Sequence, residues 1–391
     1  MKNEWKPEQL RATSEEIRGA VMPKSITPDM VGGTLLGVVN ALGEVVEVLG
    51  GIPRGHVKVK VEATDGTHPA SAAGAVVYVD TFCVGGIPTQ SFPRQEYEVD
   101  ENCEVEFDIP IGCKFAVYSK LMGFGASPQH VYEATYEPRE VILQHFPVGI
   151  WWAQVVWIAR EDDEGYGEMR ILTFSNYVTD WESEEMQSKL GAGELFDDST
   201  ENGIIVSTPE TCFMLPKSGS LSEERMEWCK PKDYRNEFIT LPGVWYDGAN
   251  GEGLTDAENK ARADMDGNLN TAKILAHAAE APAAGWCAGQ DQWKQVYLPS
   301  AGQLSLMQEN RTAINALMTA ANADGCSYKL LPYQNAGGQW QLPNGHHELW
   351  WSSTRSTFGR SWDVYYDGRI SYSDSDSTRD VRAVMAFHFE Y

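Results

Sequence analysis

The segment 349–387, near the C-terminal end, constrains the fold more than any other part of this chain. It reads LWWSSTRSTFGRSWDVYYDGRISYSDSDSTRDVRAVMAF. One group of its residues has the pattern of a fixed framework: Trp350, Trp351, Ser352, Ser353, Thr354, Trp362, Val364, Gly368, Val381, Arg382, Ala383, Val384 and Phe387. Around Val364 and Ile370, apolar residues alternate with other residues at the period of a strand. We therefore expect short strands on which a framework carries a second, polar set of side chains.

That second set has an unusual composition. Residues 355–380 contain no Lys, Glu, Gln, Met or Ala, in a chain whose net charge is −25. A solvated surface of an acidic protein would normally be rich in Lys and Glu. Tyr, Ser, Asp, Arg and Gly are instead typical of binding loops, where Tyr gives rigid contact area and Ser and Gly give adaptable polar contacts. The composition favours a binding surface; the alternative is an ordinary surface loop rich in serine and aspartate.

The genetic code suggests how this composition could arise. Lys, Glu, Gln, Met and Trp have no codon that ends in C, whereas every residue at the candidate positions has one. Together with Trp351-Ser352-Ser353-Thr354, Trp362-x-Val364 and Val381-Arg382-Ala383-Val384, this bias resembles the variable proteins of diversity-generating retroelements, known from phages and from gut Bacteroides. The resemblance implies a variable region at about 348–387.

The same resemblance implies a set of ligand-binding positions above the framework, because loops on a rigid frame can vary without changing the fold. The set is Arg355, Thr357, Phe358, Gly359, Arg360, Asp363, Tyr365, Tyr366, Asp367, Arg369, Ser371, Tyr372, Ser373, Asp374, Ser375, Asp376, Thr378, Arg379 and Asp380. The tyrosines and arginines are the expected energetic anchors. Neighbouring side chains on a strand point to opposite faces, so we expect about two thirds of the set to face outward.

The residues before this segment predict helices and a capped turn. Residues 254–279 contain two helical patches, and 301–323 read as a helix that follows a buried strand at Val296 to Leu298. Ser300 and Gln303 have the spacing of a capping box. The order of strand, capped helix, WWSST and terminal strand resembles the C-type lectin fold. The resemblance implies a C-type lectin-like domain over 148–391, with its two chain ends paired in one sheet.

An antiparallel β-sandwich is predicted for residues 53–147. Val57, Val59 and Val61 alternate with polar residues, and further short apolar runs follow at roughly 8–15-residue spacing, separated by turn residues. No cluster of titratable residues marks this region as a site. We interpret it as a spacer.

Residues 1–52 are predicted to form a helical assembly or attachment segment. Val31, Leu35, Val38, Leu42, Val45 and Leu49 follow a heptad spacing. Leu at a and Val at d favour assemblies larger than dimers. The alternative is a helix that packs on its own domain. The predicted fold class is thus α+β, with a helical segment, a β-sandwich and a C-type lectin-like domain in that order.

Net charge and cysteine content limit the classes of partner and the compartment in which the chain folds. A net charge of −25 argues against nucleic acid and against anionic membranes. The chain has seven cysteines without a CxxC motif and no recognisable secretory signal or apolar stretch long enough to span a bilayer, which favours folding in a reducing cytosol. We expect a host or bacterial surface protein or glycan as ligand, and no cofactor. The resemblance implies a homotrimer.

Two metal motifs fail on spacing. His346-His347-Glu348 lacks a legible third ligand, and adjacent histidines rarely bind one ion. In Asp264-x-Asp266-Gly267-Asn268, the position twelfth in a calcium loop is Leu275, so a turn or helix cap is the preferred interpretation. We expect no metal site.

These inferences lead to one preferred function and two alternatives. The preferred one is non-catalytic recognition of a host-surface ligand, at a phage or prophage tail tip after assembly in the cytoplasm, or else at a bacterial cell surface. One alternative is a structural virion or adhesion protein with a fixed lectin-like domain. The other is an enzyme, since formylglycine-generating enzymes share this fold. It is disfavoured because Cys287 and Cys326 have no adjacent base to activate them.

Overall fold

A computed structural model describes residues 53–64, 69–84, 87–88, 93–159, 166–175, 200–216, 225–229, 254–277, 280–290, 295–323, 326, 328–342, 349–356 and 360–387. The described residues from Gly55 onward belong to one compact unit, Gly55–Tyr391. The predictions for 1–52, for His346 to Glu348 and for Thr357, Phe358 and Gly359 lie outside the described residues. The domain boundaries proposed at 53–147 and 148–391 stay a prediction.

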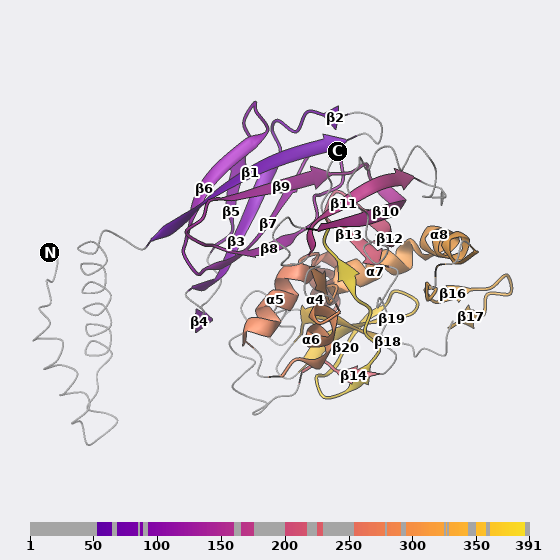
Figure 1. The fold of residues 1–391 in the computed structure, drawn as a ribbon. Helices are drawn as coiled ribbons and strands as arrows, with labels where there is room; N and C mark the ends of the chain where they lie inside the picture. Colours follow the sequence, from indigo (N-terminus) through magenta and orange to yellow (C-terminus); the bar gives the residue numbers. More distant parts are fainter. Residues whose placement is uncertain are drawn as a thin grey trace, which may run out of the picture. The chain divides into compact units, whose positions relative to one another are not determined.

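The chain from residue 54 to 145 forms two facing sheets (Figure 1). One contains β1 (Arg54–Thr64), β2 (Pro69–Ala70), β6 (Glu104–Pro110) and β9 (Arg139–His145). The other contains β3 (Val76–Val84), β4 (Ile87–Pro88), β5 (Gln95–Glu98), β7 (Lys114–Lys120) and β8 (His130–Glu133). Val59, Val79 and Val117 come from different strands of the two sheets and are fully buried in one core, as the alternating pattern predicts.

The β-sandwich is mostly antiparallel, with one exception to the prediction. β9 runs parallel to β1 over seven residue pairs, from Val57 and Arg139 to Ala63 and His145. The strand before β9 lies in the opposite sheet, so the chain crosses between sheets and can enter beside β1 from either end. Parallel neighbours require such a crossover instead of a tight hairpin, and local alternation cannot reveal it.

A six-stranded sheet follows, in the order β11-β10-β12-β13-β22-β15. Its strands are β10 (Gly149–Ala159), β11 (Tyr166–Ser175), β12 (Thr200–Ser207), β13 (Cys212–Pro216), β15 (Val296–Tyr297) and β22 (Val384–Met385). β10 and β22, the first and last of these strands in the chain, lie in the same sheet but do not pair with each other. β22 pairs with β13 and β15, and β12 and β13 lie between it and β10. Direct pairing of the two ends is therefore wrong for the described residues.

Five helices lie in the described part of this region: α4 (Leu254–Ala263), α5 (Gly267–His277), α6 (Pro282–Ala288), α7 (Ala301–Glu309) and α8 (Arg311–Ala323). The two patches predicted within 254–279 are confirmed as α4 and α5. The single helix predicted for 301–323 is two helices, because α7 ends at the C-cap Asn310. The Ser300–Gln303 capping box is confirmed.

The last strands form small sheets. β18 (Leu349–Arg355), β19 (Arg360–Tyr365) and β20 (Ile370–Asp374) make a three-stranded antiparallel sheet. Two-stranded ladders join β14 (Met226–Glu227) to β21 (Thr378–Arg379), and β16 (Tyr333–Gln334) to β17 (Trp340–Gln341). The observed fold class is α+β.

Residues 381–387 separate two hydrophobic cores. Val381, Ala383, Met385 and Phe387 belong to one core, whereas Val384 and Ala386 belong to the other. The alternation of side chains along an extended strand explains this division. Both cores also reach the framework tryptophans, since Trp351 lies in the first core and Trp350 and Trp362 lie in the second.

Candidate ligand-binding surface

The Trp-Ser-Ser-Thr stretch of β18 forms an irregular join with β19. Trp351 pairs with Asp363 and Arg355 pairs with Ser361, so the ladder shifts register between them. Side-chain hydroxyls bridge the irregular stretch: Ser352 Oγ donates to the Trp362 carbonyl at 2.7 Å, and Ser361 Oγ donates to the Thr354 carbonyl at 3.0 Å. Small hydroxyl residues are thus needed here to satisfy backbone groups that the ladder leaves open.

The same stretch is fixed from its other side. Ser353 N donates to the Pro299 carbonyl at 2.8 Å, and the backbone N–H of Ala301 donates to Thr354 Oγ1 at 2.9 Å. Trp228 Nε1 donates to the Ser352 carbonyl at 2.8 Å. The N-terminus of α7 and the framework strand therefore hold one another in place, which explains why the capping box and WWSST occur together in the sequence.

The structure divides the predicted binding set by exposure. Six members are exposed: Arg360, Arg369, Tyr372, Asp374, Asp376 and Thr378. Six are partly buried: Tyr365, Tyr366, Asp367, Ser371, Ser373 and Arg379. Four are buried: Arg355, Asp363, Ser375 and Asp380. The binding role of the set stays a prediction, and in this conformation the four buried members offer no surface to a ligand.

Arg360, Tyr372 and Asp374 form an exposed trio of side chains on β19 and β20. Arg360 and Asp374 are directly paired across the two strands, and Arg360 Nε donates to Asp374 Oδ1 at 2.9 Å. The Arg360 guanidinium also lies over the Tyr372 ring, 5.3 Å from its centroid. Tyr372 in turn meets the buried Trp362 edge-on, with centroids 5.5 Å apart. The trio is therefore an ordered polar and aromatic patch that rests on a framework tryptophan.

The turn between β19 and β20 carries a second stack. Arg369 lies over the Tyr365 ring, 4.9 Å from its centroid, and its Nε donates to Asp367 Oδ2 at 2.7 Å. Gly368 has φ +86°, a conformation that favours glycine. Arg262 of α4 donates to the Gly368 carbonyl at 3.2 Å. The framework glycine thus shapes the turn that presents Tyr365 and Arg369.

A buried carboxylate organises the opposite face of the sheet. Asp363 Oδ2 accepts hydrogen bonds from Ser373 Oγ at 2.6 Å and from Arg379 Nε at 3.2 Å. Burial raises the pKa of Asp363, and these two hydrogen bonds oppose the rise. Arg379 also lies 5.5 Å from the centroid of the Trp351 ring. Asp363 therefore positions Arg379 and Ser373 from within.

Arg355 and Asp380 are also internal. Arg355 is fully buried, and this burial lowers the pKa of its guanidinium to about 9. Asp380 receives the Trp351 backbone N–H on its carbonyl at 3.0 Å and donates its own N–H to the Leu349 carbonyl. Composition alone placed these residues with the exposed ones, because it carries no information on side-chain direction.

Sequence reasoning missed a fixed aromatic neighbour of the predicted surface. Trp340, on β17, meets Tyr366 edge-on with ring centroids 4.7 Å apart. Arg311 of α8 lies over the Trp340 ring, 5.0 Å from its centroid. The paired residue Gln334 lies opposite Trp340 in the β16–β17 ladder. An aromatic residue within a stretch rich in amides, YQNAGGQWQ, was the only available signal in the sequence.

Other functions would require a reactive cysteine, a metal site or a membrane-spanning helix. Cys287 is fully buried in a hydrophobic core, and burial raises its pKa well above the usual thiol value. Among the described residues, no three His, Cys, Asp or Glu side chains are grouped so that they could hold a metal ion. Within the same residues, no helix combines the length and apolarity needed to cross a membrane.

Comparisons with known proteins show only remote likenesses. No family model and no curated protein matches the chain. A fimbrial protein from Bacteroides ovatus is 10% identical, with a TM-score of 0.33, over 85% of this chain and 71% of that chain. The shaft pilin spaA from Lactobacillus rhamnosus GG is 9% identical, with a TM-score of 0.19, over 43% and 90%. Likenesses this remote carry no argument about function or about a C-type lectin-like topology.

Proposed function

We propose that this chain is a non-catalytic ligand-binding protein whose C-terminal, C-type lectin-like domain presents a retroelement-diversified surface. The main support for this proposal is that residues 349–387 divide into two groups. The framework side chains are buried, whereas Arg360, Tyr372 and Asp374 form an ordered patch above them. Side chains in such a patch can change while the buried framework keeps the backbone in place.

The chemistry of the patch suits recognition of a macromolecule. Tyr and Arg supply most of the binding energy in many interfaces. Arg360 and Arg369 are each stacked on a tyrosine and bonded to an aspartate, so their side chains are ordered before a ligand arrives. This preorganisation reduces the entropy lost on binding.

The setting of this activity is part of the proposal. We propose a phage or prophage tail tip, or alternatively a bacterial cell surface, with a host-surface protein or glycan as ligand. A homotrimer would bring several such surfaces together and add avidity to individually weak contacts. An enzymatic role is disfavoured, because the buried thiol of Cys287 has a raised pKa and forms little thiolate near neutral pH.

Binding to intact bacteria tests the proposal. Labelled full-length chain is titrated onto a panel of Bacteroides strains, and retention is measured by flow cytometry. Replacement of Tyr365, Tyr366 and Tyr372 by Ala should reduce retention at least about tenfold, as expected when hot-spot side chains are lost. Tyr136→Ala is the matched control, since Tyr136 is an exposed tyrosine of the β-sandwich segment, 75% accessible.

The outcome separates binding from a purely structural role. If the triple variant binds like the wild type, the proposed surface is wrong. If the triple variant loses its oligomeric state by light scattering while the wild type binds no strain, the structural alternative is preferred. Sequencing of the flanking DNA tests diversification separately: a near-copy of the segment that differs at adenines, beside a reverse transcriptase gene, is the expected finding.

A further inference from the structure

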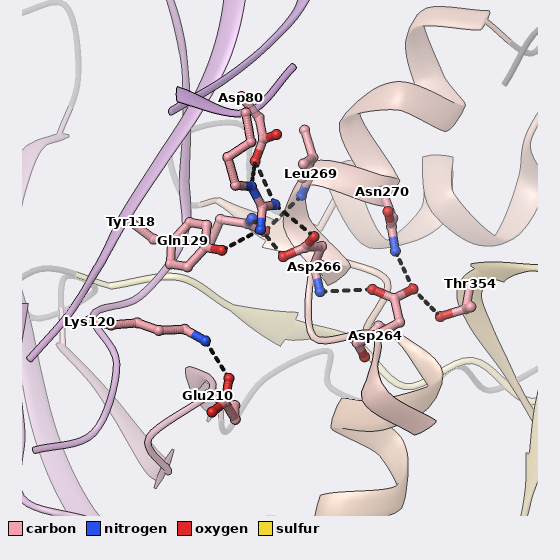
Figure 2. A network of polar contacts seen from close by, with 12 residues as sticks. Asp80, Tyr118, Lys120, Gln129, Glu210, Asp264, Asp266, Leu269, Asn270 and Thr354 are labelled. Atoms are coloured by element: carbon pink, nitrogen blue, oxygen red, sulfur yellow. Dashed lines mark hydrogen bonds and ion pairs between the residues drawn. The ribbon is translucent and has the colours of Figure 1, made fainter. Parts of the chain in front are cut away.

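Arg94, far from the proposed ligand surface in sequence, joins two parts of the structure. It lies just before β5 and bonds to the sandwich strands: its Nε and Nη2 donate to Asp80 Oδ2 at 2.9 and 2.7 Å, and its Nη1 donates to the Tyr118 hydroxyl at 2.7 Å. Its Nη2 also donates to Asp266 Oδ2 at 3.0 Å, in the loop between α4 and α5. Figure 2 shows this network.

The bonds to the sandwich set the direction in which Arg94 points. Its guanidinium lies 5.3 Å from the centroid of the Tyr118 ring, and its side chain is only 33% exposed. Two aspartates raise its pKa further above the ordinary arginine value, although burial opposes this rise. Arg94 therefore stays charged and presents a fixed donor to Asp266.

Asp266 is hydrogen-bonded to the buried carboxylate of Asp264, two residues earlier in the chain. Its backbone N–H donates to Asp264 Oδ1 at 3.0 Å. The other oxygen, Asp264 Oδ2, accepts from Asn270 Nδ2 at 2.8 Å and from Thr354 Oγ1 at 2.6 Å. Thr354 is the last framework residue before Arg355, where the predicted binding set begins.

These contacts form one continuous path from the sandwich to the framework strand. It runs from Asp80 through Arg94, Asp266 and Asp264 to Thr354. We infer that Arg94 is a positioning residue for the ligand-binding surface: it holds the α4–α5 loop, and that loop holds the end of β18 through Thr354. The relevance to ligand binding rests on the proposed function, whereas the positioning of β18 does not.

The structure supplies a matched control for this path. Lys120 of β7 forms an ion pair with Glu210, which lies between β12 and β13, so it also joins the sandwich to the C-terminal region. Lys120 and Arg94 have equally exposed side chains, 33% each. Glu210 is linked to the N-terminus of α7 less directly: its backbone N–H donates to Thr208 Oγ1 at 3.3 Å, and Thr211 Oγ1, one residue further on, accepts from Gln303 Nε2 at 3.0 Å. Arg94 and Lys120 thus differ mainly in the hydrogen bonds that follow their carboxylate partners, since those of Asp266 lead through Asp264 to Thr354 itself.

Hydrogen exchange followed by mass spectrometry tests the inference without any ligand. Arg94→Met in the full chain should speed exchange at least about tenfold in peptides that cover 298–303 and 349–356, which contain the Ala301 and Thr354 amides. Lys120→Met should leave the peptide that covers 349–356 within about twofold of the wild type. Arg94→Lys, which keeps the charge, should restore part of the protection.

A double variant distinguishes positioning from general destabilisation. In a Thr354→Val background the end of the path is already cut, so Arg94→Met should no longer change exchange in 349–356. The inference is overturned if Arg94→Met and Lys120→Met act alike on these peptides, or if Arg94→Met and Thr354→Val act additively. Should Arg94→Met fail to fold, Asp266→Asn replaces it in both comparisons. A failure of the tyrosine binding test leaves this result untouched, so the two proposals fail independently.

Discussion

Thr354 Oγ1 lies 2.6 Å from Oδ2 of the buried carboxylate of Asp264, although 90 residues separate them in the chain. The same hydroxyl accepts the Ala301 backbone N–H at 2.9 Å. One threonine thus connects the framework strand, the start of α7 and the α4–α5 loop. This position makes its hydroxyl, more than its volume, the group that the fold requires.

Thr354→Val should therefore destabilise the protein by about 1–3 kcal/mol, because a buried acceptor and a buried N–H both lose their partner while the volume stays nearly constant. Urea unfolding monitored by tryptophan fluorescence measures the change. Thr378→Val is the matched control at an exposed position, and it should stay within about 0.5 kcal/mol of the wild type. Equal effects of both variants would refute the role assigned to the hydroxyl.

The pH dependence of stability should reveal Asp264. Burial, reinforced by the charge of Asp266, raises the pKa of Asp264 from 3.8 to about 6. A carboxyl group whose folded-state pKa is raised favours folding in its protonated form, so its contribution is present in acid and is lost as the pH rises through about 6. The stability difference between wild type and Asp264→Asn should therefore shift in favour of the wild type between pH 7.5 and pH 5. A pH-independent difference would contradict the raised pKa.

His145 should make the folded protein less stable as the pH falls, which is the opposite of the effect expected for Asp264. Its Nδ1 donates to the Gly125 carbonyl at 2.6 Å and its Nε2 accepts from Ser119 Oγ at 2.8 Å, and burial lowers its pKa to about 4. In the unfolded chain this imidazole binds a proton near pH 6.5, whereas in the folded chain it stays neutral down to about pH 4. The folded state therefore loses stability as the pH falls from about 6.5 toward 4. The loss should be about 3 kcal/mol. In His145→Gln the slope of stability against pH should flatten over this range; an unchanged slope would disprove the assignment.

Framework and surface residues should differ sharply in their tolerance of substitution. Trp362→Ala removes a side chain that is 1% exposed and should cost about 3–5 kcal/mol through the cavity it leaves. Asp374→Ala removes only an exposed ion pair with Arg360 and should cost less than about 1 kcal/mol. Thermal unfolding of both variants measures this contrast. Comparable losses would mean that the patch belongs to the core.

Local patterns predicted the elements that depend on neighbouring residues. Alternation placed Val57, Val59 and Val61 in the core, and the spacing of Ser300 and Gln303 predicted the capping box. The break between α7 and α8 at Asn310 was missed, because apolar residues continue on both sides at helical spacing. The partner strand of β1 could not be deduced either, since pairing across a crossover leaves no local trace.

The candidate site was predicted as a segment but not as a surface. Composition marks a segment in which polar and aromatic residues are concentrated, yet it cannot tell Asp363, which is buried, from Asp374, which is exposed. Arg94 was missed altogether, because its partner Asp266 is 172 residues away and an isolated arginine between strands has no distinguishing pattern. Such long-range ion pairs are set by the tertiary fold alone.

The division of residues 381–387 between two cores has a consequence for how this gene can change. The apolar residues from 383 to 387 alternate between the two cores, so inserting or deleting a single codon would exchange the two sets of side chains and disrupt both cores at once. A substitution disturbs one position only. The C-terminal region should therefore accumulate point changes of constant length, and alleles that differ in length should be confined to the loops outside it.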